Sequence, residues 1–447
     1  MDILICSKLF LPDNEIGAVR PTNFAKYLNE MGHQVTVITG VAESLITGFK
    51  PLSDAIKIER VNQSNLALKL ISKVEHTVRG RKSQIAKSHA QHPKKEKIID
   101  RLYGKIKSFR FQAYALYLEV DWYLQAKMIV NKNLANSRYD IVLSSFGPLG
   151  AHLIGRYIKN IKKANFWIAD LRDNMHSEEY AKVINSIFLY FEREMMKKAD
   201  AITLISNGQR DMLKKAVRDN AFKIRKVFVV HNGYENRIEI KKVKNDSNIL
   251  KIGYTGALYS GKRDMSLLFA AVGQLINENK IGRSEIEIHY AGNSSSDLLN
   301  QAYAYGIQEI IQDHGYITRG QSIKLQNSCD FLVVLSWNTS IEQGILSGKF
   351  FEYLQAFKPL IAITNGELEN AELTEMVEDL NLGIACEYIR KDIDLIRLKD
   401  YLLTQYKNKV AGNGVVYNPN IKEIEAFHYQ NISQKLEKIC QNLVTHD

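Results

Sequence analysis

Short apolar runs of β-like character alternate with amphipathic helical runs along almost the whole chain, and this pattern constrains the fold more than any other feature. Strands that are separated by helices usually pair in parallel through right-handed crossovers. The first half has strand-like runs at residues 2–6, 34–39, 56–61, 141–144, 165–169, 201–205 and 227–230. The second half repeats the alternation at residues 250–254, 285–290, 310–314, 331–335, 360–363 and 383–386. The sequence therefore predicts an α/β protein with parallel sheets in both halves.

The length of 447 residues is too great for one ordinary core and suits two or three domains. The polar, Lys-rich run 238–248 is the natural linker, and the Asn-, Gly- and Pro-rich stretch 412–420 leads into a last helix at about 421–443. Other helical runs are 20–31, 113–134, 149–159 and 178–198. We therefore predict domains at residues 1–237 and 238–415, followed by a closing helical segment at 416–447.

The cysteines are scattered along the chain without paired spacing. They are Cys6, Cys329, Cys386 and Cys440. This usage favours a reducing compartment and argues against a disulfide framework or a cysteine metal cluster. The first residues do not resemble a signal peptide, and no apolar run approaches the length that spans a bilayer. With an apolar fraction of 45%, the composition is that of a soluble globular protein, expected in the cytoplasm.

Nearly all of the net charge of +11 lies in one segment. Between Lys69 and Arg110 there are 13 Lys or Arg and 3 Asp or Glu, interspersed with Leu, Ile, Tyr and Phe. We place a basic helical insertion at about residues 66–112. Three interpretations stay open: a solvated insertion, a patch for anionic lipid on the inner face of the plasma membrane or for a lipid-diphosphate acceptor, and a nucleic-acid surface. No recognised nucleic-acid motif accompanies the charge, which disfavours the third.

The stretch 344–363 combines a polar turn, a helix start and a strand. Its turn runs from Gly344 to Gly348, Lys349 follows at the helix start, and Glu352 lies one turn further on. A helix start offers unpaired N–H groups and a partial positive charge, which suit a phosphate. Lys349 adds a full charge, and Glu352 is placed to accept sugar hydroxyl protons. We interpret the stretch as a cradle for a diphosphate and a sugar, with a helix start that carries a solvated Lys and Glu as the alternative.

This stretch resembles the C-terminal signature of glycosyltransferase family 4, whose members are retaining enzymes of the GT-B architecture. Further matches occur in the family's order along nearly the whole chain. They are the runs 3–17, 19–28, 32–39, 167–173, 231–233, 252–256 and 261–262. The resemblance implies two Rossmann-like domains with parallel sheets facing across a cleft, and a C-terminal helix that crosses back to the first domain. The family often carries two glutamates with seven residues between them, and here Gly344 stands at the first position.

The resemblance places a nucleotide-sugar donor in the second domain. Gly256 would let the diphosphate approach the backbone, and Lys262 would neutralise the leaving nucleotide. Ala257 replaces an arginine that is common in the family, and Arg263 would compensate for it. The implied catalytic residues are Lys262, Lys349, Glu352 and His152. The implied donor-binding residues are Gly256, Arg263, Tyr316, Ile317, Ser336 and Gly348.

The acceptor is expected in the first domain. Gly17 and Arg20 follow the first strand, and the run 170–173 follows the strand 165–169. Three charges at a strand end are difficult to bury without a purpose. The implied acceptor-binding residues are Gly17, Arg20, Asp170, Arg172 and Asp173. An internal ion-pair cluster that shapes the loop is the alternative. His152, in the first turn of a helix, would hydrogen-bond a sugar hydroxyl, and the alternative for it is a structural histidine.

The resemblance therefore implies a retaining glycosyltransferase of surface polysaccharide biosynthesis. It would move a sugar from a nucleotide-sugar to a hydroxyl of a glycan or a lipid-linked oligosaccharide. We expect no cofactor and no metal, because lysines and helix amides can stabilise the departing diphosphate. The alternatives are a nucleotide-sugar epimerase or hydrolase of the same fold and a catalytically silent nucleotide-sugar-binding subunit. The absence of a G-x-G-x-x-G motif argues against an enzyme that binds a nicotinamide cofactor.

Overall fold

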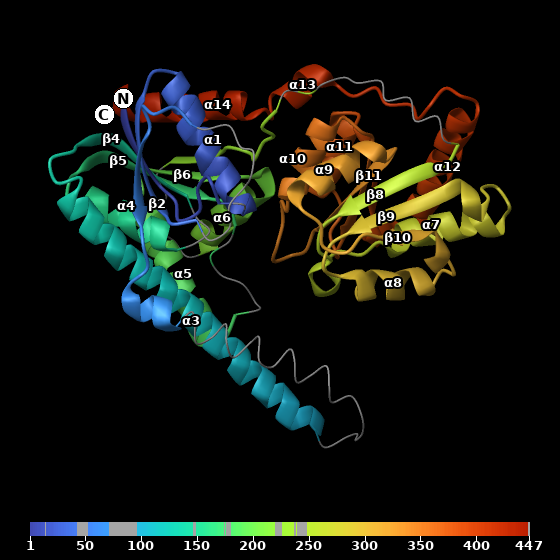
Figure 1. Cartoon of the computed structure of the whole chain (residues 1–447), viewed down its shortest axis with the longest axis horizontal. Helices are drawn as coiled ribbons and strands as arrows, with labels where there is room; N and C mark the ends of the chain where they lie inside the picture. Colours follow the sequence, from blue (N-terminus) through green and yellow to red (C-terminus); the bar gives the residue numbers. More distant parts are fainter. Residues whose placement is uncertain are drawn as a thin grey trace. The chain divides into compact units, whose positions relative to one another are not determined.

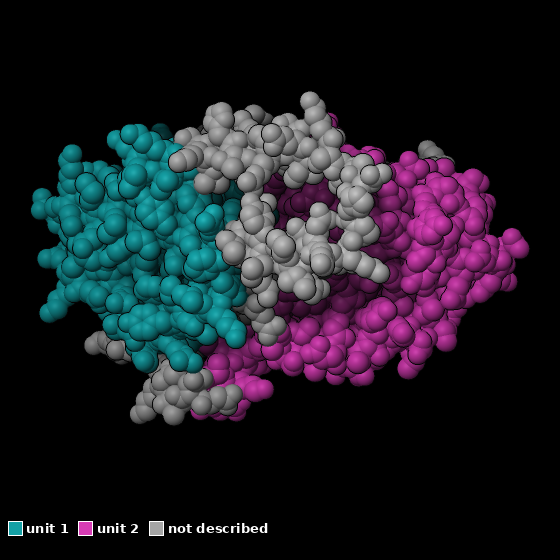
Figure 2. Space-filling model, turned by 90° about the horizontal axis from the view of Figure 1, so that it is seen from below, with its two compact units in different colours: residues 1–204, 220–228, 433–447 teal, residues 205–219, 229–432 magenta. Residues whose placement is uncertain are grey.

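The computed structural model describes residues 1–13, 15–42, 52–70, 96–145, 149–173, 175, 180–219, 226–236, 238 and 248–445. The chain divides into two compact units. Unit 1 comprises residues 1–204, 220–228 and 433–447, and unit 2 comprises residues 205–219 and 229–432, coloured teal and magenta in Figure 2. Each unit contains one sheet that is accompanied by helices (Figure 1).

Unit 1 is built on a seven-stranded sheet with the order β3-β2-β1-β4-β5-β6-β7. Strands β1 to β6 pair in parallel, and Ile3 lies opposite both Val35 and Ile141. The strands are β1 (Asp2–Cys6), β2 (Gln34–Gly40), β3 (Lys57–Val61), β4 (Tyr139–Ser145), β5 (Ala164–Leu171), β6 (Ala201–Leu204) and β7 (Lys226–Val229). The helices are α1 (Ile16–Glu30), α3 (Glu96–Lys132), α4 (Gly150–Asn160) and α5 (Lys182–Lys198).

Unit 2 is built on a six-stranded parallel sheet with the order β10-β9-β8-β11-β12-β13. The strands are β8 (Leu250–Thr255), β9 (Ile286–Ala291), β10 (Ile311–Asp313), β11 (Phe331–Trp337), β12 (Leu360–Asn365) and β13 (Gly383–Glu387). The helices are α6 (Asn207–Asp219), α7 (Ser266–Asn277), α8 (Ser295–Tyr303), α9 (Arg319–Ser328), α10 (Gly348–Ala356), α11 (Glu372–Asp379), α12 (Lys391–Val410) and α13 (Ile421–Glu425). The last helix, α14 (Tyr429–Thr445), begins in unit 2, and its residues from Ser433 group with unit 1.

Alternate side chains of β11 enter two different hydrophobic clusters. Phe331 and Val333 pack in a cluster with the apolar faces of α7 and α12. Leu332 and Val334 pack in a second cluster with residues of α10 and α11. Successive side chains of a strand point to opposite faces of the sheet, so a strand that is apolar throughout is covered on both sides. The predicted α/β fold with parallel sheets is confirmed.

Some predicted boundaries differ from the structure. The last predicted helix is divided into α13 and α14, because the intervening backbone bonds elsewhere. Tyr234 N donates to Phe427 O at 3.0 Å, and Tyr429 N donates to Tyr234 O at 3.0 Å. Helix α3 begins at Glu96, inside the predicted basic insertion, while residues 71–95 of that insertion lie outside the described residues, as does most of the predicted linker. None of the helices in the described ranges combines the length and the apolar character that a membrane span requires.

Candidate functional site

The start of α10 places Lys349 and Glu352 beside the end of β8. The helix begins at Gly348, and Lys349 Nζ lies 2.8 Å from Glu352 Oε1. Gln326 of α9 donates from Nε2 to the same oxygen at 2.5 Å and to Thr255 Oγ1 at 3.0 Å. Thr255 is the last residue of β8. The carboxylate of Glu352 is therefore held by two donors, and one of them also binds the strand end.

A buried tyrosine fixes the turn that follows β8. Thr255 N donates to Tyr353 Oη at 3.0 Å, and the hydroxyl groups of Thr255 and Tyr353 lie 2.9 Å apart. Burial raises the pKa of Tyr353 well above its usual range, so its hydroxyl stays protonated. Gly256 then donates from N to Ala291 O at 2.9 Å. A side chain at Gly292 would clash with Gly256 O, so this close approach of the ends of β8 and β9 requires glycine.

Lys262 lies in a second polar group at the carboxyl edge of the same sheet. Its Nζ is 3.0 Å from Glu342 Oε2 and 5.2 Å from the ring centroid of Trp337. Trp337 ends β11, and its Nε1 donates to the same Glu342 oxygen at 2.7 Å. Asn365, at the end of β12, donates from Nδ2 to Lys262 O at 3.0 Å. The lysine is thus held by its backbone, by a carboxylate and by an aromatic face.

Arg263 occupies an aromatic environment rather than an open one. Its guanidinium carbon lies 4.4 Å from the ring centroid of Tyr259 and 5.7 Å from that of Trp337. Its Nη1 donates to Ala257 O at 3.3 Å. The side chain is buried and reaches the residue where the family often has an arginine. The guanidinium therefore lies beside Ala257, and its compensating role stays a prediction.

The remaining donor candidates lie in different surroundings. Ser336 is buried, and its Oγ donates to Ile345 O at 2.6 Å, so it supports the loop that leads to α10. Tyr316 is 87% exposed in the loop after β10, and Ile317 beside it is partly exposed. Gly348 is the first residue of α10. The structure brings Gly256, Lys349 and Glu352 together through Gln326 and Thr255, and the binding roles stay predictions.

Gly344 has a backbone conformation and surroundings that exclude a side chain. Its φ is +68°, in the left-handed region that favours glycine. A Cβ at this position would clash with Ser206 Oγ and would lie 2.8 Å from both Gln209 N and Gly208 Cα. A Cβ at Gly208 would lie 2.5 Å from Gly344 N. The start of α6 therefore fills the space where the family often has its first glutamate.

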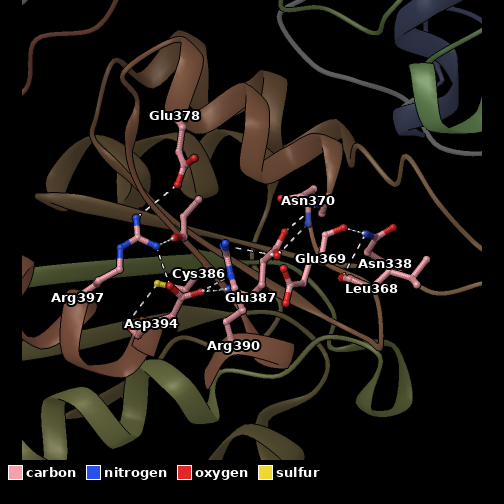
Figure 3. A network of polar contacts seen from close by, with 12 residues as sticks. Asn338, Leu368, Glu369, Asn370, Glu378, Cys386, Glu387, Arg390, Asp394 and Arg397 are labelled. Carbon is pink, nitrogen blue, oxygen red and sulfur yellow. Dashed lines mark hydrogen bonds and ion pairs between the residues drawn. The ribbon is translucent and has the colours of Figure 1, made fainter. Parts of the chain in front are cut away.

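A further polar network surrounds the end of β13 (Figure 3). The two oxygens of Glu387 accept from Asn370 N at 3.0 Å and from Ala371 N at 2.8 Å. Asp394 accepts from Glu387 N at 2.7 Å and from Arg397 Nη1 at 2.7 Å. Both carboxylates are buried, and each oxygen has a donor. Among the described residues, no group of three or more His, Cys, Asp or Glu is placed to hold a metal ion.

In unit 1, Arg20 and Asp170 form a buried ion pair. Arg20 donates from Nε to Asp170 Oδ2 at 2.9 Å and from Nη2 to Oδ1 at 2.7 Å. Thr203 and Ser145 add hydroxyl donors at 2.7 and 2.9 Å. Burial raises the pKa of Asp170, but the charge of Arg20 and these hydrogen bonds outweigh it and hold the pKa below its usual range. The geometry favours the internal ion pair over direct contact between these two residues and an acceptor.

Two other acceptor candidates are joined directly. Arg172 donates from Nη1 to Gly17 O at 2.6 Å, which ties the loop after β5 to the second residue of α1. A Cβ at Gly17 would lie 2.6 Å from Leu9 Cδ1 and 3.4 Å from the Arg172 guanidinium nitrogens. Asp173, the next residue of this loop, is exposed. Gly17 and Arg172 are therefore neighbours, as expected of residues in one site.

His152 lies in the first turn of α4 and is buried. Its Nδ1 is 2.7 Å from Ser144 Oγ, which also accepts from Trp167 Nε1 at 2.7 Å. Burial lowers the pKa of His152 to about 3, with Asp170 opposing and Arg172 reinforcing the shift. The imidazole is therefore neutral near pH 7. Residues 146–148, which precede the helix, lie outside the described residues.

Sequence reasoning missed several residues that build this site. They are Gln326, Tyr353, Trp337, Glu342, Gly292, Ser145 and Thr203. Trp337 and Glu342 carry one usable signal, since they follow a strand in a parallel sheet, where ligands bind beyond the carboxyl ends. Gln326 has no such signal, because it contacts the site from the interior of a helix.

No family model and no curated protein matches this chain. Solved structures do. A sucrose-phosphate synthase from Thermosynechococcus elongatus has a TM-score of 0.61 at 11% identity, with all of both chains covered. An α,α-trehalose-phosphate synthase (UDP-forming) from Burkholderia vietnamiensis has a TM-score of 0.58 at 8% identity, covering 99% of this chain and 100% of its own. A TarM variant from S. aureus, in complex with fondaparinux, α-GlcNAc-glycerol and UDP, has a TM-score of 0.54 at 9% identity, covering 98% and 99%.

These matches extend over nearly the whole chain and include both sheets. The chain therefore has the GT-B fold, made of two α/β units with parallel sheets. It is similar in fold to sugar-transferring enzymes, at identities that establish the fold and not the reaction.

Proposed function

We propose that this protein is a retaining glycosyltransferase. It transfers a sugar from a nucleotide-sugar donor to a hydroxyl of a glycan or a lipid-linked oligosaccharide, as a step in surface polysaccharide biosynthesis. The observation that carries the proposal is the arrangement at the carboxyl edge of the unit 2 sheet. There Lys262 pairs with Glu342, and Lys349, in the first turn of α10, pairs with Glu352; both carboxylates are partly exposed.

This arrangement suits a departing nucleoside diphosphate. A leaving diphosphate develops negative charge, and preorganised cations and backbone N–H groups lower the barrier most when they face that charge. Lys262, Lys349 and the start of α10 provide these groups without a metal ion. Glu352 would accept hydroxyl protons from the donor, because its second oxygen and its partly exposed surface leave room for them. Tyr316 and Ile317 would lie against the nucleotide base.

The acceptor is proposed to bind at unit 1. Gly17, Arg172 and Asp173 lie at the carboxyl ends of its strands, with Arg20 and Asp170 supporting them from the interior. His152 would direct a neutral ring toward a sugar hydroxyl.

We also propose that the basic insertion holds the protein at the anionic inner face of the plasma membrane, since Lys and Arg gain about 1 kcal/mol each near such a surface. Sedimentation with anionic and neutral vesicles would test that attachment.

A catalytically silent nucleotide-sugar-binding subunit is the second candidate. The specific observation in its favour is Gly344, which stands where glycosyltransferase family 4 often has a glutamate. A side chain at this position would clash with the start of α6.

One experiment separates these candidates. Thermal unfolding is measured with nucleoside diphosphates and nucleotide-sugars, and a ligand at 100 times its Kd should stabilise the protein by about 2.7 kcal/mol. Any stabilising nucleotide-sugar is then incubated with and without a polyprenyl-linked glycan. Transfer that depends on the glycan supports the proposed enzyme. Binding without turnover supports the silent subunit, turnover without a glycan supports an epimerase or hydrolase, and the absence of any stabilising nucleotide contradicts the proposal.

A further inference from the structure

A carboxylate side chain cannot be introduced at position 344 by a local adjustment of the structure. The start of α6, which fills this space, is itself fixed. Glu372, the first residue of α11, accepts from Asn207 N and from Gly208 N at 2.8 Å each. Moving α6 aside would break two hydrogen bonds to a charged group, each of which contributes about 1.5–3 kcal/mol. A carboxylate that acts beside Lys262 must therefore come from another residue.

Glu342, two residues earlier, places a carboxylate beside Lys262. Its backbone is held in a tight turn, with Glu342 N donating to Thr339 Oγ1 at 3.0 Å and Thr339 N donating to Glu342 O at 2.9 Å. Its Oε2 accepts hydrogen bonds from Lys262 Nζ and from Trp337 Nε1. Within the described part of the chain, no donor is recorded for its Oε1, and the side chain is partly exposed. One oxygen thus anchors the carboxylate, which leaves the other oxygen for a further donor.

We infer that Glu342 binds the transferred sugar, accepting a hydroxyl proton of that sugar at Oε1. The inference rests on the proposed function and names a residue that the sequence pattern does not indicate. Lys262 acts on the diphosphate and Glu342 on the sugar, so their ion pair sets the spacing between the two parts of the donor. Trp337 fixes that pair through its indole N–H and its ring face.

The inference predicts a specific separation of two affinities. A nucleoside diphosphate has no sugar, and the negative charge of Glu342 weakly repels it. A nucleotide-sugar gains the hydroxyl contact. Replacing Glu342 with Gln should therefore leave the affinity for the diphosphate unchanged or raise it, and should reduce the extra affinity that the sugar provides. A residue that only positions Lys262 would instead change both affinities in the same direction and by a similar factor.

The test is calorimetry on the full-length protein with UDP, UDP-glucose, UDP-N-acetylglucosamine, GDP and GDP-mannose. For each nucleotide-sugar that binds wild type, we compare its Kd with that of the matching diphosphate. In E342Q the ratio should shift against the sugar by roughly tenfold or more, the scale of a lost hydrogen bond to a charged group. Glu342→Asp, which keeps the charge but withdraws the carboxylate, should give a similar shift and covers the case in which E342Q folds poorly.

Glu367→Gln is the matched control. Glu367 accepts from Ser340 N at 2.8 Å in the turn that also contains Glu342, and it has no recorded contact with Lys262. Its variant should leave the ratio unchanged. An unchanged ratio in both Glu342 variants would overturn the inference while leaving the proposed function intact. If wild type binds none of the nucleotides, the proposed function fails instead, and the two failures are distinguishable.

Discussion

Similar ion pairs occur in both units at the carboxyl ends of parallel strands, but they differ in exposure. In unit 1, the side chains of Arg20 and Asp170 are 2% and 0% exposed. In unit 2, those of Lys262 and Glu342 are 37% and 24% exposed, and those of Lys349 and Glu352 are 32% and 13% exposed. The buried pair also saturates both carboxylate oxygens with other donors, whereas the exposed pairs leave oxygens and ammonium protons that solvent can reach.

This difference separates two tasks that charged residues perform at a strand end. A buried charge that loses its partner is strongly destabilising, so the Arg20–Asp170 pair is expected to maintain the fold. A half-exposed pair contributes little to stability, so it can exchange its partner for a ligand at small cost. The comparison therefore favours a stabilising role for the pair in unit 1 and leaves the pairs in unit 2 accessible for the proposed donor chemistry.

The largest expected effect is on the buried pair. Asp170→Asn should lower the free energy of unfolding by about 3–5 kcal/mol, because Arg20 keeps its charge without a buried counter-ion. Urea denaturation would measure the loss. Asp211→Asn, which breaks an exposed pair with Arg210, is the control and should cost less than about 1 kcal/mol. Equal stability of the two variants would remove the distinction drawn here.

The next effect is on sugar transfer. Lys262→Ala and Lys349→Ala should each reduce the transfer rate by about 10²–10³, the usual consequence of losing one preorganised electrostatic contact. Their unfolding midpoints should change little, since both lysines are partly exposed. Lys399→Ala breaks a surface pair with Glu278 and should leave both properties unchanged. Near wild-type rates in both site variants would place the donor elsewhere.

A smaller effect is expected at Glu352. Glu352→Gln should weaken binding of the preferred nucleotide-sugar by roughly 1–3 kcal/mol, the scale of a hydrogen bond to a charged group. Calorimetry measures the affinity, and Glu278→Gln is the control for the loss of one surface carboxylate. Unchanged affinity with lowered stability would mean that Glu352 serves only to hold Lys349 and Gln326 in the fold.

A further prediction concerns pH and the buried imidazole of unit 1. The pKa of His152 is lowered from 6.5 to about 3 in the folded protein. Between these values the unfolded chain binds more protons, so this residue makes stability fall as the pH decreases. The fall should approach about 1.4 kcal/mol per pH unit well below 6.5. Denaturation at pH 7.5 and 5.0 should show a smaller decrease for His152→Gln than for wild type, and equal decreases would contradict the burial of a neutral ring.

The smallest expected effect is that of metal removal. Lysines and helix amides are proposed to provide the positive charge that a bound cation would otherwise supply, so excess EDTA should leave transfer essentially unchanged. Turnover is measured after dialysis against EDTA and after addition of Mg²⁺ or Mn²⁺. Complete loss of activity that either ion restores would mean that a metal ion, and not the lysines, stabilises the charge of the leaving diphosphate.

Much of the fold could be predicted from the alternation of strand-like and helical runs. Each predicted strand overlaps a strand of the structure in both halves. Central strands that are covered on both faces, such as β11, are apolar almost throughout and easily recognised. Errors occur where long-range backbone contacts decide the outcome. Hydrogen bonds between Tyr234 and residues 427 and 429 divide the last predicted helix, and no local pattern indicates them.

The site could be predicted less fully. Lys349 and Glu352 follow a glycine-rich turn at a helix start, which indicates them as candidates, and the resemblance to glycosyltransferase family 4 adds Lys262. The presence of Glu342 and Gln326 in the site depends on contacts between segments that are distant in the sequence. Residue spacing does not reveal such contacts. Glu342 is found only when β11 is seen to continue to Trp337, two residues past Leu335, where the predicted strand ends.

The contact between Gly208 and Gly344 also has an evolutionary consequence. Glycine and glutamate codons can differ by a single base, so a carboxylate at position 344 is only one step away at the level of the gene. In the folded protein a side chain at position 344 would clash with the start of α6. A side chain at position 208 would in turn clash with the backbone of Gly344. Each replacement is harmful before the other has occurred, and Ser206 and Gln209 oppose even the pair. Single substitutions at position 344 or 208 are therefore expected to be selected against in this protein, and changes in the proposed sugar site would have to arise at other residues such as Glu342.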